Sequence, residues 1–228
     1  MSNIYNDENI KIYIEKLRPF AEDIFGNNSA SHDINHLIRV MRTALYIQTK
    51  EGGDRFIIAI SAFLHDIHRV IQNNENKYIT PKESLPIVKE IIEKSKIDLE
   101  EEQLRQILFC IEHHEDKNWN GNNVNDINTL ILQDADNIDA IGAIGIGRGF
   151  IYGNQYKQPQ FVDNIPFEEF EGYEEKIKDV SLMHFFHNKL IKLGKNMNTE
   201  TAKDIATERV HFVELFIDEF IKEWNAKF

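Results

Sequence analysis

The stretch F-I-I-A-I-S-A-F-L-H-D-I, residues 56–67, carries the strongest structural signal in the chain. It is apolar on nearly every side as far as Leu64, and a helix with almost no polar face is typical of the centre of a protein core. The stretch then places an imidazole and a carboxylate side by side, at His65 and Asp66. We therefore expect a helix buried on all sides that delivers these two polar groups into the interior.

A buried carboxylate is costly unless it is paired or binds a cation. Neighbouring residues of a helix point about 100° apart, yet His65 and Asp66 can both reach one ion that lies near the helix end. Imidazole and carboxylate together suit Mn, Fe, Co, Ni, Zn or Mg. Taken alone, this pair leaves two interpretations open, a metal site and an ordinary satisfied polar pair in the core.

The sequence on both sides of this stretch predicts more helices. The apolar residues of 37–45 recur with the i, i+3, i+4, i+7, i+8 spacing of an amphipathic helix. Thr80-Pro81-Lys82-Glu83 has the form of a capping box with proline at the first helical position. Strand-like alternation is scarce. We expect a single all-α domain over residues 1–228, with its core roughly at 25–220, about seven or eight helices and an irregular insertion near 152–175.

Composition excludes several classes of function. The chain of 228 residues has 26 Lys and Arg against 38 Asp and Glu, a formal charge of −12, which disfavours binding to nucleic acids and to anionic membrane surfaces. Its apolar run of 56–64 is far shorter than the roughly 20 residues that span a bilayer. The single cysteine, Cys110, and a polar, acidic start predict a cytoplasmic protein.

Two further segments carry groups that can bind a metal. In S-H-D-I-N-H-L-I-R-V, residues 31–40, His36 immediately precedes an apolar stripe, so its ring should lie at the edge of a buried face. In D-A-D-N-I-D, residues 134–139, three carboxylates interrupt an otherwise apolar stretch. One of the three should complete the metal sphere.

These segments, in this order, resemble the HD superfamily of metal-dependent phosphohydrolases, and more closely its YpgQ/YedJ-like branch. The similar blocks are S-H-D-I-N-H-L-I-R-V, L-H-D-I, D-A-D-N-I-D-A-I-G-A-I-G-I-G-R, H-F-F-H-N-K-L and M-N-T-E-T-A. The resemblance implies an HD-domain helical bundle with four metal ligands, His36, His65, Asp66 and Asp136. Asp136 is preferred over Asp134 because the last ligand of the family is the Asp of the A-D pair.

The resemblance also implies one divalent metal ion, with Mn favoured over Mg, Co, Ni, Fe and Zn. Two neutral imidazoles and two carboxylates leave a residual charge near zero on such an ion, and they leave two positions of an octahedral sphere for water or a substrate oxygen. An ion of this kind lowers the pKa of bound water and neutralises charge on a phosphoryl group. Hydrolysis of a phosphoric ester or anhydride is the expected reaction.

Other residues of the similar blocks are expected to act beside the metal. Asp66, His32 and Asp33 are the predicted catalytic residues, although His32 could only pack at the helix start and Asp33 could only cap the helix. The family has a histidine near His113 and His114, which predicts a phosphate contact, whereas a helix C-terminus that favours a cationic imidazole is the alternative. The predicted phosphate-binding cations are Arg39, Arg42, Arg148 and Lys189.

The glycine run G-A-I-G-I-G-R-G, residues 142–149, follows a predicted helix, whereas a dinucleotide-binding fingerprint follows a strand. We therefore interpret these glycines as permitting close helix packing or a sharp exit from a helix.

The branch resemblance favours a nucleoside or deoxynucleoside triphosphate pyrophosphohydrolase that releases pyrophosphate. The expected partner is thus a phosphorylated small molecule, a nucleotide, with no nucleic acid and no membrane; a homodimer is an open alternative to a monomer. A nucleotidase or a guanosine polyphosphate hydrolase is the alternative within the same chemistry. Alternatives of other classes are a di-iron HD oxygenase, for which His32 with His113 or His114 would supply extra ligands, and a non-catalytic nucleotide sensor.

Overall fold

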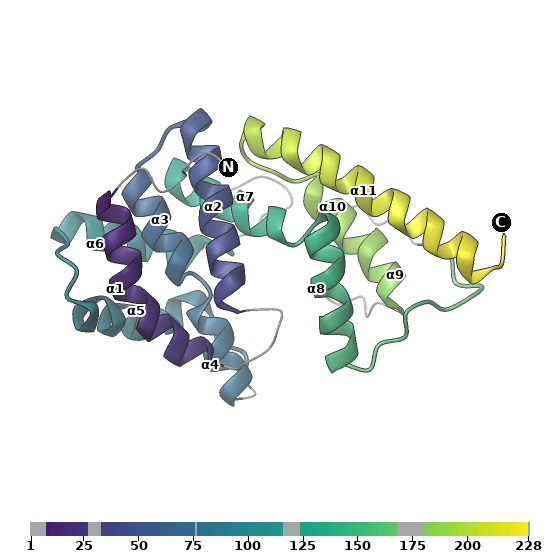
Figure 1. The fold of residues 1–228 in the computed structure, drawn as a ribbon, viewed down its shortest axis with the longest axis horizontal. Helices are drawn as coiled ribbons and strands as arrows, with labels where there is room; N and C mark the ends of the chain where they lie inside the picture. Colours follow the sequence, from purple (N-terminus) through teal and green to yellow (C-terminus); the bar gives the residue numbers. More distant parts are fainter. Residues whose placement is uncertain (1–7, 27–32, 76, 116–123, 168–179, 228) are drawn as a thin grey trace. The chain divides into compact units, whose positions relative to one another are not determined.

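The computed structural model of the protein describes residues 8–26, 33–75, 77–115, 124–167 and 180–227. All regular secondary structure in these ranges is helical, which confirms the predicted all-α class (Figure 1). Among the helices described there, none is both long enough and apolar enough to cross a bilayer.

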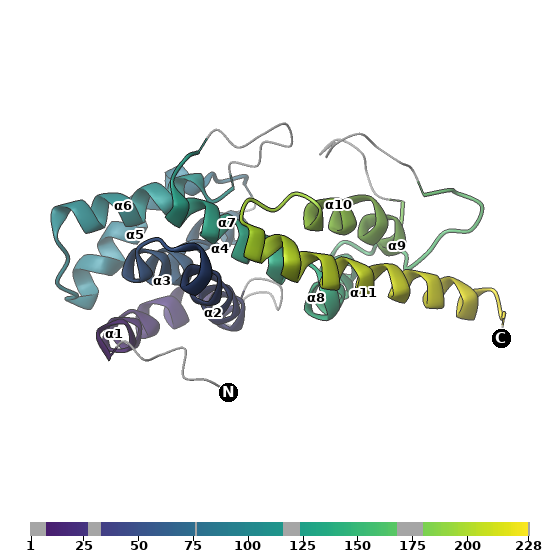
Figure 2. The same ribbon diagram turned by 90° about the horizontal axis from the view of Figure 1, so that it is seen from above.

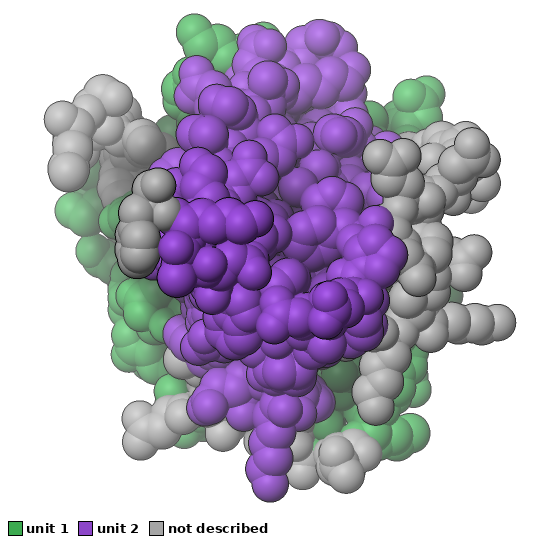
Figure 3. Space-filling view, turned by 90° about the vertical axis from the view of Figure 1, so that its right-hand side faces the viewer, with its two compact units in different colours: residues 1–135 green, residues 136–228 purple. Residues whose placement is uncertain are grey.

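The chain divides into two compact units, residues 1–135 and 136–228 (Figure 3). The expectation of a single domain stays a prediction. The first unit contains α1 (Glu8–Phe25), α2 (Ile34–Glu51), α3 (Arg55–Leu64), α4 (Ile67–Glu75), α5 (Pro81–Ser95), α6 (Glu101–His113) and most of α7 (Ile127–Asp139). The second contains α8 (Gly142–Gln155), α9 (Leu182–Phe185), a π-helix (Phe186–Leu190), α10 (Ile191–Gly194) and α11 (Glu200–Trp224).

Helix α3 is the centre of the first unit. Every residue from Ile57 to Leu64 is at most 1% exposed, which confirms the prediction of a helix buried on all sides. It packs against α1, α2 and α6, as Figures 1 and 2 show from two directions. Each buried Ile, Leu or Phe side chain of this kind contributes about 1.5–3 kcal/mol of hydrophobic stabilisation.

The helix starts follow the local sequence. Asp54 caps α3 by accepting hydrogen bonds from the backbone N–H groups of Phe56 and Ile57, at 2.8 and 3.0 Å. Thr80 and Glu83 form the predicted capping box of α5, with Pro81 at the first helical position. The predicted stripe of α2 is buried as expected, at Leu37, Val40, Met41, Ala44 and Leu45.

Helix α3 ends at Leu64, close to the helix end that the sequence placed at His65 and Asp66. These two residues form a turn, and α4 begins at Ile67. The start of a second helix directly after the turn is not marked in the sequence, since neither residue is a helix breaker such as glycine or proline. The turn places both side chains of the pair at the junction of two helices.

The glycines of residues 142–149 lie within α8. A Cβ atom on Gly149 would stand 2.3 Å from the ring of Phe186, which is fully buried. Likewise, a Cβ on Gly153 would stand 2.4 Å from the side chain of Leu182. The interpretation as small residues for close helix packing is confirmed, and no nucleotide-binding loop is formed by this run.

The predicted insertion near 152–175 is partly wrong at its start. Helix α8 continues to Gln155, and irregular chain begins with Tyr156 and extends through 167. Residues 168–175 of the prediction lie outside the described residues.

Cys110 provides a test of the packing between α6 and α7. Its side chain is 1% exposed, and burial raises the pKa of the thiol to about 12, while a hydrogen bond from the Thr129 hydroxyl partly opposes the increase. Because the thiolate is the reactive form, we expect no labelling by iodoacetamide at pH 8 in the native protein and full labelling in denaturant, measured by intact mass. Rapid labelling of the native protein would show that this part of the core opens readily.

Candidate metal centre

The turn between α3 and α4 buries two polar groups in the first unit. His65 is 0% exposed and Asp66 is 3% exposed. The Nδ1–H of His65 donates to the carbonyl oxygen of Ala62 at 2.9 Å, which leaves a lone pair on Nε2. A histidine held by a backbone carbonyl in this way is oriented as metal-ligating histidines usually are.

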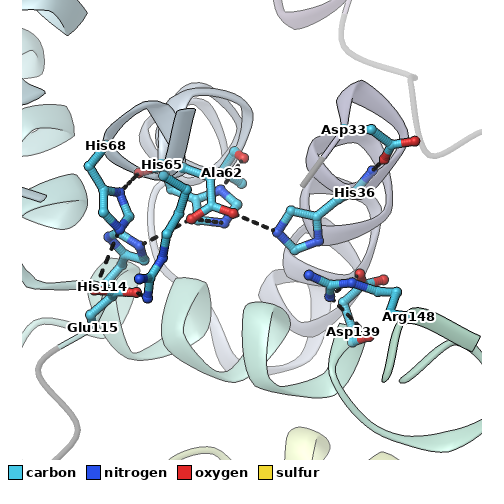
Figure 4. Close-up of polar contacts among 11 residues, drawn as sticks. Asp33, His36, Ala62, His65, His68, His114, Glu115, Asp139 and Arg148 are labelled. Carbon is cyan, nitrogen blue, oxygen red and sulfur yellow. Dashed lines mark hydrogen bonds and ion pairs between the residues drawn. The ribbon is translucent and has the colours of Figure 1, made fainter. Parts of the chain in front are cut away.

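Helix α2 adds the third group. Nε2 of His36 lies 3.1 Å from Oδ2 of Asp66, and Nε2 of His65 lies 3.7 Å from Oδ1 of the same carboxylate (Figure 4). The three side chains offer ligand atoms within 4.8 Å of one another, and all three are buried. Two nitrogen donors and one carboxylate, converging in a buried space, fit a divalent transition metal.

Asp33 determines how His36 is presented. It is the N-cap of α2, and its Oδ1 accepts a hydrogen bond from the backbone N–H of His36 at 2.8 Å. Burial alone would raise the pKa of Asp33, but hydrogen bonds from Asn35 and from the His36 N–H, together with the charge of Arg39, lower the pKa below its usual value. Asp33 is therefore an ionised cap at the turn from which His36 projects.

A second group of buried ligand atoms lies on the other side of Asp66, and of its members the sequence singled out His114 but not His68. His68 of α4 and His114, which follows α6, are both 0% exposed, and with Asp66 they offer ligand atoms within 4.8 Å of one another. The imidazoles of the cluster form a row, in which ring centroids are 5.2 Å apart for His36 and His65, 5.0 Å for His65 and His114, and 5.3 Å for His114 and His68. The only signal for His68 in the sequence was the H-D-I-H spacing.

Glu115 lies at the end of this row, next to His68 (Figure 4). Its Oε2 is 3.5 Å from Nε2 of His68, and its Oε1 accepts from the guanidinium of Arg69. Burial raises the pKa of Glu115, but His68, His114 and Arg69 outweigh that effect and hold it at about 2. Burial lowers the pKa of His68, although Glu115 and Asp66 oppose that decrease. Sequence reasoning missed Arg69 and Glu115 as well.

The predicted substrate residues of the first unit differ in placement. Arg39 is half-buried and lies one turn after His36, about 60° away around α2, whereas Arg42 is exposed and about 120° away. His113 ends α6 with its ring 4.4 Å from that of Phe109. His114 joins the buried cluster instead. His32, a predicted catalytic residue, lies outside the described residues.

Three other predicted residues belong to the second unit. Arg148 donates to Oδ2 of Asp139 at 2.8 Å, so this predicted phosphate-binding cation is held by a carboxylate. The ammonium of Lys189 lies 5.8 Å from the ring centroid of Phe185, at the π-helix. Asp136 is half-buried near the end of α7, and its role as a metal ligand stays a prediction.

The imidazole of His184 is buried within the second unit. Its two ring nitrogens lie 2.7 Å from the Ser181 hydroxyl and 3.1 Å from the carbonyl oxygen of Ile165.

The chain is similar to known proteins over most of its length. The family profile of the HD domain matches residues 33–141. The YpgQ protein of Bacillus subtilis is 28% identical over 209 residues, 92% of each chain. Its crystal structure in complex with ADP covers 94% of this chain and 96% of that one, with 25% identity and a TM-score of 0.67.

A higher identity is found with a crystal structure of an HD-superfamily hydrolase from Bacillus thuringiensis. That structure is 33% identical, covers 95% of this chain and 99% of its own, and has a TM-score of 0.71. The region matched by the HD-domain profile, residues 33–141, includes the cluster of His36, His65 and Asp66. The chain therefore belongs to the HD superfamily of metal-dependent phosphohydrolases.

Proposed function

We propose that the protein is a nucleotide pyrophosphohydrolase that converts a nucleoside or deoxynucleoside triphosphate to the monophosphate and pyrophosphate. The observation that carries this proposal is the buried cluster of His36, His65 and Asp66 in a chain similar to YpgQ, which was crystallised with ADP. The resemblance to the YpgQ/YedJ-like branch supports the same substrate class.

His36, His65 and Asp66 would hold the ion, with Asp136 as the proposed fourth ligand and Mn²⁺ as the favoured metal. A divalent cation bound there would supply Lewis acidity toward a phosphoryl oxygen and toward water. In the overall reaction, water adds to the α-phosphorus and the bond to the bridging oxygen of the β-phosphate breaks, so that pyrophosphate leaves. The chain itself must then orient the triphosphate and accept the proton that water loses.

Arg39 is the better placed of the two predicted cations on α2, because it shares the side of the helix from which His36 projects. We assign Asp33 a positioning role, since its carboxylate already accepts hydrogen bonds from Asn35 and from the His36 N–H. A base needs an available lone pair at an accessible pKa, and the lowered pKa of Asp33 does not favour that role.

Product analysis tests the reaction. The purified chain is incubated with Mn²⁺, Mg²⁺ or Co²⁺ and with triphosphates, monophosphates or guanosine polyphosphates, and the products are separated by anion exchange. We expect pyrophosphate and monophosphate in equal amounts from a triphosphate. Orthophosphate without pyrophosphate would contradict the proposal. Turnover of monophosphates alone would identify a nucleotidase, and turnover of guanosine polyphosphates alone would identify the other alternative.

Two outcomes address the remaining classes. Tight nucleotide binding without any product at saturating metal would identify a sensor. An activity that requires oxygen and bound iron would identify an oxygenase, whereas anaerobic hydrolysis with Mn²⁺ would exclude that role for the protein.

A further inference from the structure

Arg209 of α11 contacts the corner between α7 and α8, residues 139–142. Its guanidinium donates a hydrogen bond to the carbonyl oxygen of Ile138 at 2.5 Å, in the last turn of α7. The last carbonyls of a helix have no partner within the helix, and a basic side chain is one of the groups that can satisfy them. The two residues are 71 positions apart in the chain, so this contact ties α11 to the end of α7.

The hydrocarbon stem of Arg209 covers the start of α8. A Cβ atom on Gly142 would stand between 3.1 and 3.2 Å from the Cβ, Cγ and Cδ atoms of Arg209, so the stem lies directly over this glycine. Gly142 has a φ of +73°, which costs glycine little and other residues much more. A Cβ on Gly145 would stand 2.1 Å from the carbonyl oxygen of Ala140. The backbone of the corner is therefore tightly packed, and Arg209 contacts both of its ends.

The charge of Arg209 lies where the helix end needs it. Asp136 and Asp139 are in the last turn of α7, where the negative end of the helix dipole disfavours carboxylates. Arg148 pairs with Asp139. Burial lowers the pKa of Arg209, whereas the charge of Asp139 opposes that decrease, and an arginine stays charged in proteins. Arg209 thus adds a second positive charge beside this turn.

We propose that Arg209 is a positioning residue for Asp136: by holding the Ile138 carbonyl, it determines the direction of the last turn of α7 and of the carboxylate on that turn. The inference rests on the proposed function in one respect, the assignment of Asp136 as the fourth metal ligand. Asp136 precedes Ile138 by two residues in the same turn, so a shift of that turn displaces its carboxylate. Because a metal site needs its ligands within about 0.5 Å of the productive geometry, a small displacement weakens binding.

Two other roles of Arg209 predict different results. A guanidinium that bound a substrate phosphate directly would affect the KM for the nucleotide and leave the affinity for the metal unchanged. A side chain that only stabilised the second unit would affect the Tm and leave the metal affinity of the folded protein unchanged.

Titration calorimetry with Mn²⁺ and without nucleotide tests the positioning role. In the full-length chain, stripped with a chelator, Arg209→Met removes the charge and the hydrogen bond but keeps an apolar stem. We expect its Mn²⁺ affinity to fall about 10-fold, at the low end of the loss that follows when a partner of a ligand is replaced. Arg209→Lys, which keeps the charge, should recover part of the affinity. Lys222→Met is the matched control: it removes an exposed charge of α11 that pairs with Glu219, and it should bind Mn²⁺ like the native protein.

A double-mutant cycle with Asp136→Asn shows whether Arg209 acts through that carboxylate. If it does, Arg209→Met should cause no further loss of Mn²⁺ affinity once Asp136 is asparagine. Thermal unfolding of the metal-free variants, followed by circular dichroism, measures stability separately. If Arg209→Met does not fold, the same cycle is run with Arg209→Gln, which is too short to reach the carbonyl but keeps a polar group.

The outcomes separate this inference from the proposed function. Native Mn²⁺ affinity in the Arg209 variants, with weaker binding in Asp136→Asn, would overturn the positioning role and leave the fourth ligand intact. Losses that add in the double variant would also overturn it. Native affinity in Asp136→Asn would reject the fourth ligand and the positioning role together. A non-additive loss in a protein that hydrolyses no nucleotide would support the positioning role and reject the nucleotide assignment.

Discussion

Replacement of Asp66 by asparagine is expected to remove the bound metal and to lower turnover on the order of 10³-fold or more, the scale of loss seen when a charge-stabilising group is removed from an active site. Asp66 is the one residue common to both groups of buried ligand atoms. Asparagine has nearly the same shape but no charge, so it cannot offset the charge of a divalent cation held beside His36 and His65. Elemental analysis and steady-state kinetics on the same preparation measure both effects.

The helical fold should survive this change. The rest of α3 is apolar and buried, and its packing does not depend on the carboxylate, although loss of a bound metal also removes its contribution to stability. His187→Gln is the control: this histidine stacks on Phe167, with ring centroids 4.6 Å apart, and should retain metal and a helical spectrum. An Asp66→Asn variant with full activity would eliminate the proposed centre.

Replacement of Asp136 by asparagine is expected to have the next largest effect. The family resemblance assigns the fourth ligand to this residue. Replacing a residue that only hydrogen-bonds to a metal ligand typically weakens metal binding by roughly 10–100-fold. The loss of a directly bound carboxylate should weaken it by at least as much. Turnover should fall with occupancy and recover in part at high Mn²⁺. Titration calorimetry with Mn²⁺, together with kinetics as a function of Mn²⁺ concentration, measures both.

The neighbouring acids of α7 serve as controls. Asp139 is 3% exposed and accepts a hydrogen bond from Arg148 at 2.8 Å, so Asp139→Asn should cost stability while the metal affinity stays unchanged. Asp134 is fully buried, and the variant Asp134→Asn tests whether Asp134 or Asp136 is the fourth ligand. Unchanged metal affinity in Asp136→Asn, together with its loss in Asp134→Asn, would move the fourth ligand to Asp134.

Much of the fold was readable because its signals are local. The apolar run of 56–64 predicts a helix buried on all sides, and the capping box at Thr80 predicts where α5 begins. Each signal depends on residues within one or two helical turns of one another. Over that range, residue spacing and capping hydrogen bonds can be read directly from the sequence. The adjacent pair His65 and Asp66 is local in the same sense, and it indicated the centre of the candidate site.

The sequence placed a helix end at His65 and Asp66, but it did not predict that α4 begins directly afterwards at Ile67. The consequence is large: the turn at His65 and Asp66 starts a new helix that carries His68 back toward the same carboxylate. The ion pair of Arg148 with Asp139 was equally hidden. Arg148 as a phosphate-binding residue stays a prediction, and nothing in the sequence indicated that a carboxylate nine residues earlier pairs with it.

The sequence by itself determined the helical class, the burial of the central helix and the three members of the first buried cluster, His36, His65 and Asp66. Only the tertiary structure decided that His114 and Glu115 join them, because these residues follow α6 and contact partners 46 to 48 residues earlier in the chain. Periodicity reports which face of a helix is buried but not which other helix lies against it. The contacts of His114 and Glu115 with Asp66 and His68 depend on how the end of α6 packs against the start of α4, and no local sequence pattern specifies that packing.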